Sequence, residues 1–93
     1  MKIRKGIILR NICDTWLLIA VGEASEHCMY VREINDTMAW YWQELEQDKT
    51  VDEIVKDTLE TFEAPEDAVR KDLNKLITEL KAMNYLQEEN EQG

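Results

Sequence analysis

Few side chains in this 93-residue sequence could carry out covalent or metal chemistry. The only histidine, His27, lies in a predicted turn, and a metal site needs several ligands close together. The two cysteines, Cys13 and Cys28, match neither a C-x-x-C motif nor a zinc-binding spacing. The sequence also lacks a nucleophile-histidine motif and a glycine-rich phosphate loop. It therefore predicts a protein that is not an enzyme and that holds no metal or cofactor.

Cys13 and Cys28 are expected to be free thiols. If residues 7–12, 16–21 and 28–34 form a meander, the two cysteines lie at opposite ends of the sheet. Strands of about six residues would separate them by roughly 15 to 20 Å, well beyond the ~7 Å between Cα atoms that a disulfide allows.

The composition favours one small cytoplasmic domain. Hydrophobic residues make up 44% of the chain and charged residues 33%, which fits a single modest core. No run of about 18 apolar residues and no apolar stretch of a secretory signal is present, so a membrane partner is not expected. The formal net charge is −9. Because Lys and Arg contacts with phosphates supply most non-specific affinity, nucleic acid is not expected as a partner either.

The remaining chemistry is hydrogen bonding by exposed main chain. Residues 28–34 mix β-branched, aromatic and charged types without Gly or Pro, which is typical of a half-exposed edge strand. Asn35, Asp36 and Thr37 follow, and such side chains cap a helix N-terminus. An edge strand beside helices offers free N–H and C=O groups to an extended peptide. We take this edge to be the functional surface.

Two further strands are predicted before this edge. Residues 7–12 form the first, and Cys13-Asp14-Thr15 makes the turn after it. Residues 16–21 are apolar on both faces, which is typical of a central strand covered on both sides. A polar loop at residues 22–27 then leads to the edge strand.

The rest of the chain is predicted to be helical. The first helix spans about Asp36 to Glu46, because apolar residues recur on one face. That face consists of Met38, Tyr41, Trp42 and Leu45. Trp40 falls off this face, and two interpretations are open: its ring covers a second small contact within the fold, or it faces a protein partner.

Two more helices follow. Thr50-Val51-Asp52-Glu53 matches a capping box and starts the second helix. Pro65 starts the third, which runs to about Met83 and ends at Asn84 as a left-handed cap. Residues 87–93 are expected to be a disordered acidic tail. The predicted fold class is α+β, winged helix-turn-helix-like, with a three-stranded antiparallel sheet followed by three helices in one domain of residues 1–86.

One flank of the third helix is cationic although the protein is acidic. This flank carries Arg70, Asn74, Thr78 and Lys81, with Lys71 and Lys75 nearby. Two interpretations remain open: an ordinary solvated flank, or a surface that holds an acidic peptide.

Several short motifs occur in a fixed order along the chain. They are Tyr30–Asn35 with Thr37, Ala39 and Trp42, then Thr50-Val51-x-Glu53-Ile54, Val69-x-x-Asp72-Leu73, Leu76-Ile77-x-x-Leu80 and Tyr85-Leu86. Together they resemble the PqqD family over nearly the whole chain. Members of that family are the recognition elements of ribosomally made, post-translationally modified peptides. The resemblance implies a small winged-helix protein that binds the leader of a precursor peptide and presents it to a modifying enzyme.

The resemblance also implies a binding site. In the family the leader adds as a strand beside the third strand and lies against the third helix. The main-chain side would consist of Met29, Tyr30, Val31, Arg32, Glu33 and Ile34, and the groove side of Arg70, Leu73, Asn74, Ile77 and Lys81. The sequence departs from the family at Ile34, where Leu is usual, and at Met38 and Asn84, where Gly is usual. The implied enzyme partner is a radical SAM protein, as in pyrroloquinoline quinone or sactipeptide pathways, or a leader peptidase, as in lasso peptide pathways.

Two alternatives share this fold. A winged-helix DNA-binding regulator would use Arg70, Lys71, Lys75 and Lys81, although Asp67, Asp72 and Glu79 lie on the same helix. A structural homo-oligomer, such as a homodimer, would pair the edge strand with its own copy.

Overall fold

The computed structural model of this chain describes residues 2–26 and 31–87. Its main sheet is antiparallel, with strand order β2-β3-β4. These strands are β2 (Ile7–Ile12), β3 (Thr15–Ala20) and β4 (Val31–Ile34), and a 3₁₀ helix, η1 (Gly22–Glu26), precedes the last of them. Residues 28–30 of the predicted edge strand lie outside the described residues. The three-stranded antiparallel sheet and the central place of β3 are confirmed.

The two faces of β3 differ in burial. Leu18 and Ala20 are buried, whereas Leu17 and Ile19 on the opposite face are only half-buried. The strand is central, as predicted, but the face of Leu17 and Ile19 is covered only in part. A stretch that is apolar on both faces indicates a central strand, but it does not show how deeply each face is covered.

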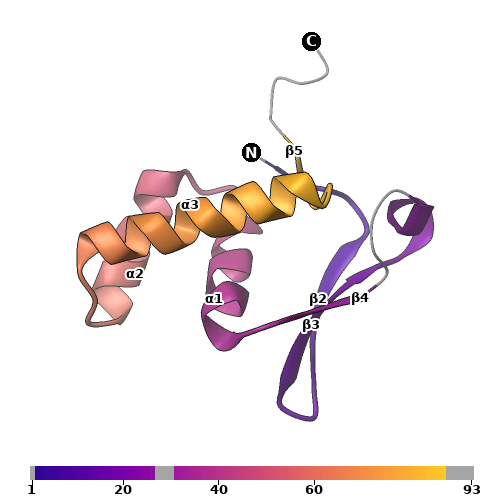
Figure 1. The fold of residues 1–93 in the computed structure, drawn as a ribbon, viewed down its shortest axis with the longest axis horizontal. Helices are drawn as coiled ribbons and strands as arrows, with labels where there is room; N and C mark the ends of the chain where they lie inside the picture. Colours follow the sequence, from indigo (N-terminus) through magenta and orange to yellow (C-terminus); the bar gives the residue numbers. More distant parts are fainter. Residues whose placement is uncertain (1, 27–30, 88–93) are drawn as a thin grey trace.

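A two-residue turn joins β2 to β3. Ile12 pairs with Thr15, which leaves Cys13 and Asp14 in the turn with φ angles of 52° and 64°. Turns with two positive φ angles match the twist of the flanking strands. The hairpin extends well away from the helices (Figure 1).

Three helices follow the sheet: α1 (Asp36–Leu45), α2 (Val51–Thr61) and α3 (Glu66–Ala82). The predicted caps are present. The Asn35 side chain accepts a hydrogen bond from the Met38 N–H at 2.8 Å, and Thr50 and Glu53 form the complete capping box. Pro65 occupies the N-cap position of α3, so the helix begins one residue later than predicted. The predicted fold class is confirmed.

The end of α3 turns the chain back onto the core. Asn84 has a φ of 65°, and the Tyr85 N–H donates to the Leu80 carbonyl at 2.8 Å. This is the left-handed cap predicted from the sequence. It brings Tyr85 and Leu86 into buried positions.

A second, two-stranded sheet closes the fold. Strand β5 (Leu86–Gln87) pairs antiparallel with β1 (Lys2–Ile3), so segments from the two ends of the sequence lie side by side (Figure 1). The prediction that Gln87 belongs to a disordered tail is wrong, because Gln87 pairs with Lys2. Strands of two residues are too short to show a periodic pattern, so neither strand could be predicted from the sequence. Residues 88–93 lie outside the described residues.

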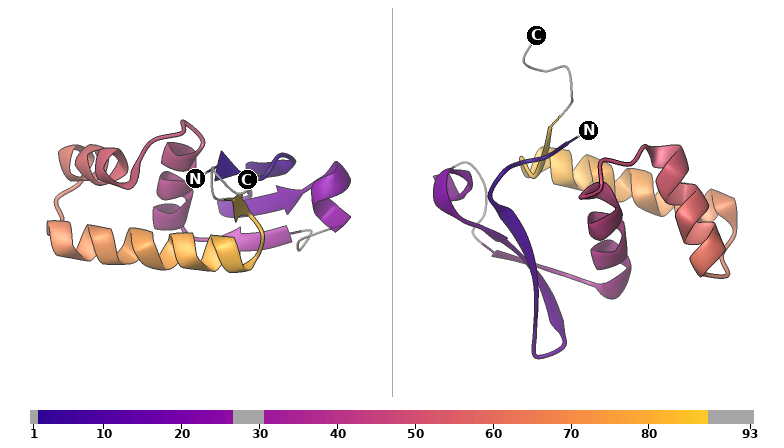
Figure 2. Two further views of the ribbon diagram at one scale, coloured as in Figure 1. Left: turned by 90° about the horizontal axis from the view of Figure 1, so that it is seen from above. Right: turned by 180° about the vertical axis from the view of Figure 1, so that it is seen from behind.

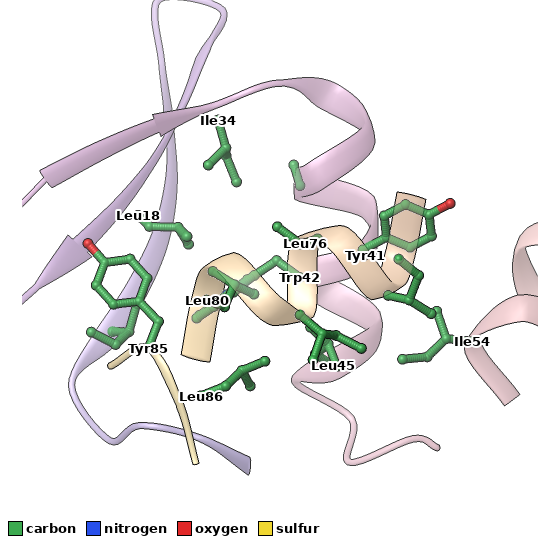
Figure 3. Close-up of a cluster of buried hydrophobic side chains, with 14 of the residues drawn as sticks. Leu18, Ile34, Tyr41, Trp42, Leu45, Ile54, Leu76, Leu80, Tyr85 and Leu86 are labelled. Atoms are coloured by element: carbon green, nitrogen blue, oxygen red, sulfur yellow. The ribbon is translucent and has the colours of Figure 1, made fainter. Parts of the chain in front are cut away.

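The helices and the sheet share one apolar core (Figure 3). Leu18 and Ile34 enter it from the sheet, and Trp42 and Leu80 enter it from α1 and α3. The rings of Trp42 and Tyr85 meet edge to face, with centroids 6.4 Å apart and planes at 76°. This packing fixes α3 alongside β4, as the view from above in Figure 2 shows.

Candidate functional site

The strand β4 is the edge of the main sheet nearest to α3 (Figure 2). On one side it pairs with β3, from Val31 opposite Ile19 to Ile34 opposite Trp16. On its other side no strand of residues 2–26 or 31–87 pairs with it. Ile34 is buried and Arg32 half-buried toward the helices, whereas Val31, 48% exposed, and Glu33 face away. The free N–H and C=O groups of this edge can therefore pair with a further strand.

A groove of about 410 Å³ runs between β4, the first turns of α1 and the middle of α3. Its wall consists of Arg32, Asn35, Thr37, Met38, Tyr41, Asp72, Lys75, Leu76 and Glu79. Apolar side chains and charges of both signs line it together. It can accept the side chains of a strand that pairs with β4.

Arg32 projects from β4 into this groove with an unused donor. Its Nη2 atom lies 3.9 Å from Glu79 Oε2, which is an ion pair but too long for a hydrogen bond. Its Nε atom is buried and has no hydrogen-bond partner in the described part of the chain. Buried donors are nearly always paired in folded proteins. Arg32 is therefore ready to donate to a carbonyl or carboxylate that enters the groove.

Tyr41 lines the groove from α1. Burial raises the pKa of its hydroxyl, and the negative charge of Asp72 raises that pKa further. The phenol therefore stays protonated near neutral pH and remains a hydrogen-bond donor.

The groove side of the site differs from the one that the family resemblance implied. Leu73 and Ile77 are core residues, 0% and 7% exposed, and none of the five implied α3 residues lines the groove. Arg70 instead donates to Asp52 of α2 and to Glu66, each at 2.9 Å. Asn74 is exposed and Lys81 is half-buried. Val31 to Ile34 do form the free edge, whereas Met29 and Tyr30 lie outside the described residues.

The α3 residues that line the groove were missed by the sequence reasoning. They are Asp72, Lys75, Leu76 and Glu79. A buried helical stripe has two flanks, and both flanks of α3 carry charges. The sequence shows the stripe but not which flank faces β4, because that depends on the direction in which α3 crosses the sheet. The cationic flank of Arg70 lies on the α2 side.

Trp40 packs within the fold, which was one of its two predicted roles. Its Nε1 donates to Thr58 Oγ1 at 2.9 Å, and its ring meets Phe62 edge to face at 5.1 Å. Trp40 thus joins α1 to α2.

The described residues hold no group of three or more His, Cys, Asp or Glu side chains placed to bind a metal ion. Cys13 is an exposed free thiol, as predicted. Cys28 and His27 lie outside the described residues. Among the helices described, none is long and apolar enough to cross a membrane.

Two solved structures share this fold. One is described as "TbiB1 in Complex with the TbiA(beta) Leader Peptide": it is 21% identical, the match covers 94% of this chain and 95% of that chain, and the TM-score is 0.76. The other is described as "Lasso peptide synthetase B1 complexed with the leader peptide": it is 18% identical, the match covers 87% of this chain and 89% of that chain, and the TM-score is 0.69. Among curated protein sequences, none matches this chain.

The family comparison covers the functional region. Residues 29–86, well over half of the chain, match the family model of coenzyme PQQ synthesis protein D (PqqD). The matched range includes β4, the three helices and every residue that lines the groove. The chain therefore belongs to the PqqD family.

Proposed function

We propose that this protein binds the leader segment of a ribosomally made precursor peptide by adding it as a strand to β4. It presents the peptide to a modifying enzyme in natural product biosynthesis and does not itself catalyse the modification. The observation that carries the proposal is the free edge of β4 beside a groove lined by α1 and α3. Family membership and a fold shared with two leader-bound proteins support it.

Main-chain pairing alone does not give useful affinity. Each added hydrogen bond contributes only about 0.5 to 1.5 kcal/mol net, and β4 is four residues long. Side-chain anchors must supply the rest. Met38 and Leu76 offer apolar contacts in the groove, and Arg32 and Lys75 offer donors to peptide carbonyls or carboxylates.

The test is an NMR titration of ¹⁵N-labelled protein with two synthetic leaders. One is the TbiA(beta) leader, and the other is the leader encoded by the precursor gene nearest to the gene of this protein. We expect the amide signals of residues 31–34 and 72–79 to shift, and a scrambled peptide of the same composition to leave them unchanged. If neither leader moves these signals at protein concentrations near 100 μM, which detects even weak complexes, the proposal is wrong.

The modifying enzyme is proposed at the level of class. It is a radical SAM enzyme or a leader peptidase that acts on the peptide while this protein holds it. The two are separated by co-purification of this protein with each enzyme in the presence and absence of the leader. Because precursor peptides are made on ribosomes, we propose that binding takes place in the cytoplasm.

The two alternatives are weighed by the charge of the surface beside β4 and by the oligomeric state. The α3 flank beside β4 exposes Asp72 with Lys75, and the chain carries a net charge of −9, so this surface does not favour DNA. A homodimer that pairs β4 with its own copy would compete with the leader for one edge. Light scattering that shows a dimer which the leader does not dissociate would favour the homodimer instead of the leader complex.

A further inference from the structure

A pocket of about 340 Å³ continues from the groove past the end of β4. It lies between the N-terminal part of α1, the C-terminal end of α2 and the first turns of α3. Its lining is Asp36, Thr37, Trp40, Tyr41, Thr58, Phe62, Ala64, Ala68, Val69 and Asp72. Three of these residues, Thr37, Tyr41 and Asp72, line the groove as well, so the two spaces adjoin.

The rings of Trp40 and Phe62 form aromatic walls of the pocket. Phe62 is 49% exposed, although it is a large apolar residue, and it directly follows α2. Its ring stands at 89° to that of Trp40, with 5.1 Å between centroids. The Trp40 Nε1 is already bonded to Thr58, so the indole offers the pocket an apolar surface and no unpaired donor. Walls fixed in this way are typical of an anchor site.

The chain at the start of α3 leaves room between these walls. Ala64, just before the helix, and Ala68, in its first turn, have the smallest side chains that a non-glycine residue can have, and Val69, which also lines the pocket, is buried. The pocket lies near the lower end of the range of small-ligand sites. It suits one aromatic or large aliphatic side chain rather than a whole cofactor.

We infer that this pocket seats an apolar anchor side chain of the same peptide that pairs with β4, an inference that rests on the proposed function. Every strand pair in the structure is antiparallel, so the peptide is expected to run antiparallel to β4. Since β4 runs toward α1, the residues that precede the paired segment of the peptide lie at the pocket. The anchor is therefore an aromatic or large aliphatic residue on the N-terminal side of that segment.

Charge at the rim restricts the neighbours of the anchor. The carboxylates of Asp36 and Asp72 lie at the pocket, and no basic residue lines it. An acidic residue beside the anchor would be repelled, whereas Lys or Arg would be attracted. This differs from the groove proper, where Arg32 and Lys75 contribute positive charge.

Phe62 can serve as a reporter that changes the pocket by a single fluorine atom. It is the only phenylalanine of the chain, so 4-fluorophenylalanine incorporation gives one ¹⁹F signal. We expect this signal to shift when either synthetic leader binds. The shift should disappear for one leader variant in which a single apolar residue, N-terminal to the paired segment, is replaced by Ala. That variant should still shift the amides of β4.

The second measurement is the leader affinity of a variant in which a larger side chain fills the pocket. Ala68→Leu places a larger side chain in the space, and Ala82→Leu makes the same change at an exposed position near the other end of α3. We expect Ala68→Leu to weaken leader binding about tenfold or more and Ala82→Leu to leave it unchanged. Replacement of the anchor residue should then cost little further affinity in the Ala68→Leu protein, because the two changes remove the same contact.

The outcomes separate the two proposals. If the amides of β4 shift while the Phe62 signal stays in place and both leucine variants bind like the unaltered protein, the pocket inference is wrong and strand addition stands. If no leader shifts either set of signals, both proposals are wrong. Thermal unfolding of both variants shows whether a loss of affinity follows from a loss of fold.

Discussion

Arg32 and Arg70 show how much the position of a charge on the fold decides its role. Both are arginines in segments that the family resemblance assigned to the binding site. Arg32 lies in the groove with a buried Nε that no described residue pairs with, whereas Arg70 is bonded to Asp52 and Glu66 on the far flank of α3. Only the first has a donor ready for a peptide in the groove.

We predict that Arg32→Met weakens leader binding about tenfold, since a hydrogen bond from a charged donor is lost. The matched change Arg70→Met should have a much smaller effect on affinity. Isothermal titration of both variants with the same leader checks the pair. Equal losses at both positions would contradict the assignment of the groove to the β4 side of α3.

Lys49 joins two carboxylates between α1 and α2. It donates to both oxygens of Glu44, at 3.2 and 3.3 Å, and to Asp57. The hydrogen bond from Lys49 is the main cause that lowers the pKa of Asp57, whereas burial is the main cause that raises the pKa of Glu44. Without Lys49, two carboxylates would face each other unpaired.

Lys49→Met should therefore lower the free energy of unfolding near neutral pH. The contribution of Asp57 is present above its unfolded pKa and is lost as pH falls through its lower folded pKa. The contribution of Glu44 depends on pH in the opposite way. It is present below the unfolded pKa of Glu44 and is lost as pH rises through the raised folded pKa. The deficit of the variant should thus shrink on acidification, first as Glu44 and then, at lower pH, as Asp57 becomes protonated. Urea unfolding across pH 3 to 8 checks this, with Lys71→Met, a change at an exposed lysine, as the control; a deficit independent of pH would contradict it.

At the scale of elements, substitutions at the end of α3 test whether the turn after the helix needs a residue with a left-handed backbone conformation. Asn84 has a positive φ and starts the turn that buries Tyr85 and Leu86. Asn84→Val should be less stable than Asn84→Gly by about 1 to 2 kcal/mol, because a β-branched residue is strained in this conformation. Chemical denaturation of the two variants gives the difference. Equal stabilities would mean that the turn can form without a left-handed residue.

Most elements could be predicted because each leaves a local signal. The capping box at Thr50, Pro65 before α3 and the apolar run of β3 each fix a boundary or a position within one stretch of sequence. The groove flank of α3 leaves no such signal, since Lys75 and Lys81 are equally good candidates until α3 is placed against β4. The pairing of Lys2 with Gln87 depends on two distant segments and is likewise not visible locally.

At the scale of the whole molecule, the first strand ties the fold together. The Arg4 N–H donates to the Tyr85 carbonyl at 2.9 Å, its Nε donates to the Asn84 carbonyl at 2.6 Å, and Ile3 packs against the core. Ile3→Ala should lower the free energy of unfolding by about 1 to 2 kcal/mol, less than for a fully buried isoleucine. Lys5→Ala, two residues later and exposed, should change it by no more than about 0.5 kcal/mol. Urea denaturation compares them, and equal effects would show that β1 adds nothing to the core.

The pairing of β1 with β5 also has a consequence for synthesis of the chain. It encloses a loop that includes nearly every other residue, and closing so long a loop carries a large entropic cost that only contacts already formed can offset. While the nascent chain emerges from the ribosome, residues 2 and 3 must wait for residues 86 and 87, which are translated after every other described element. Chains whose translation stops before that point would contain β4 and its groove but would lack the pairing of β1 with β5 that holds the end of α3.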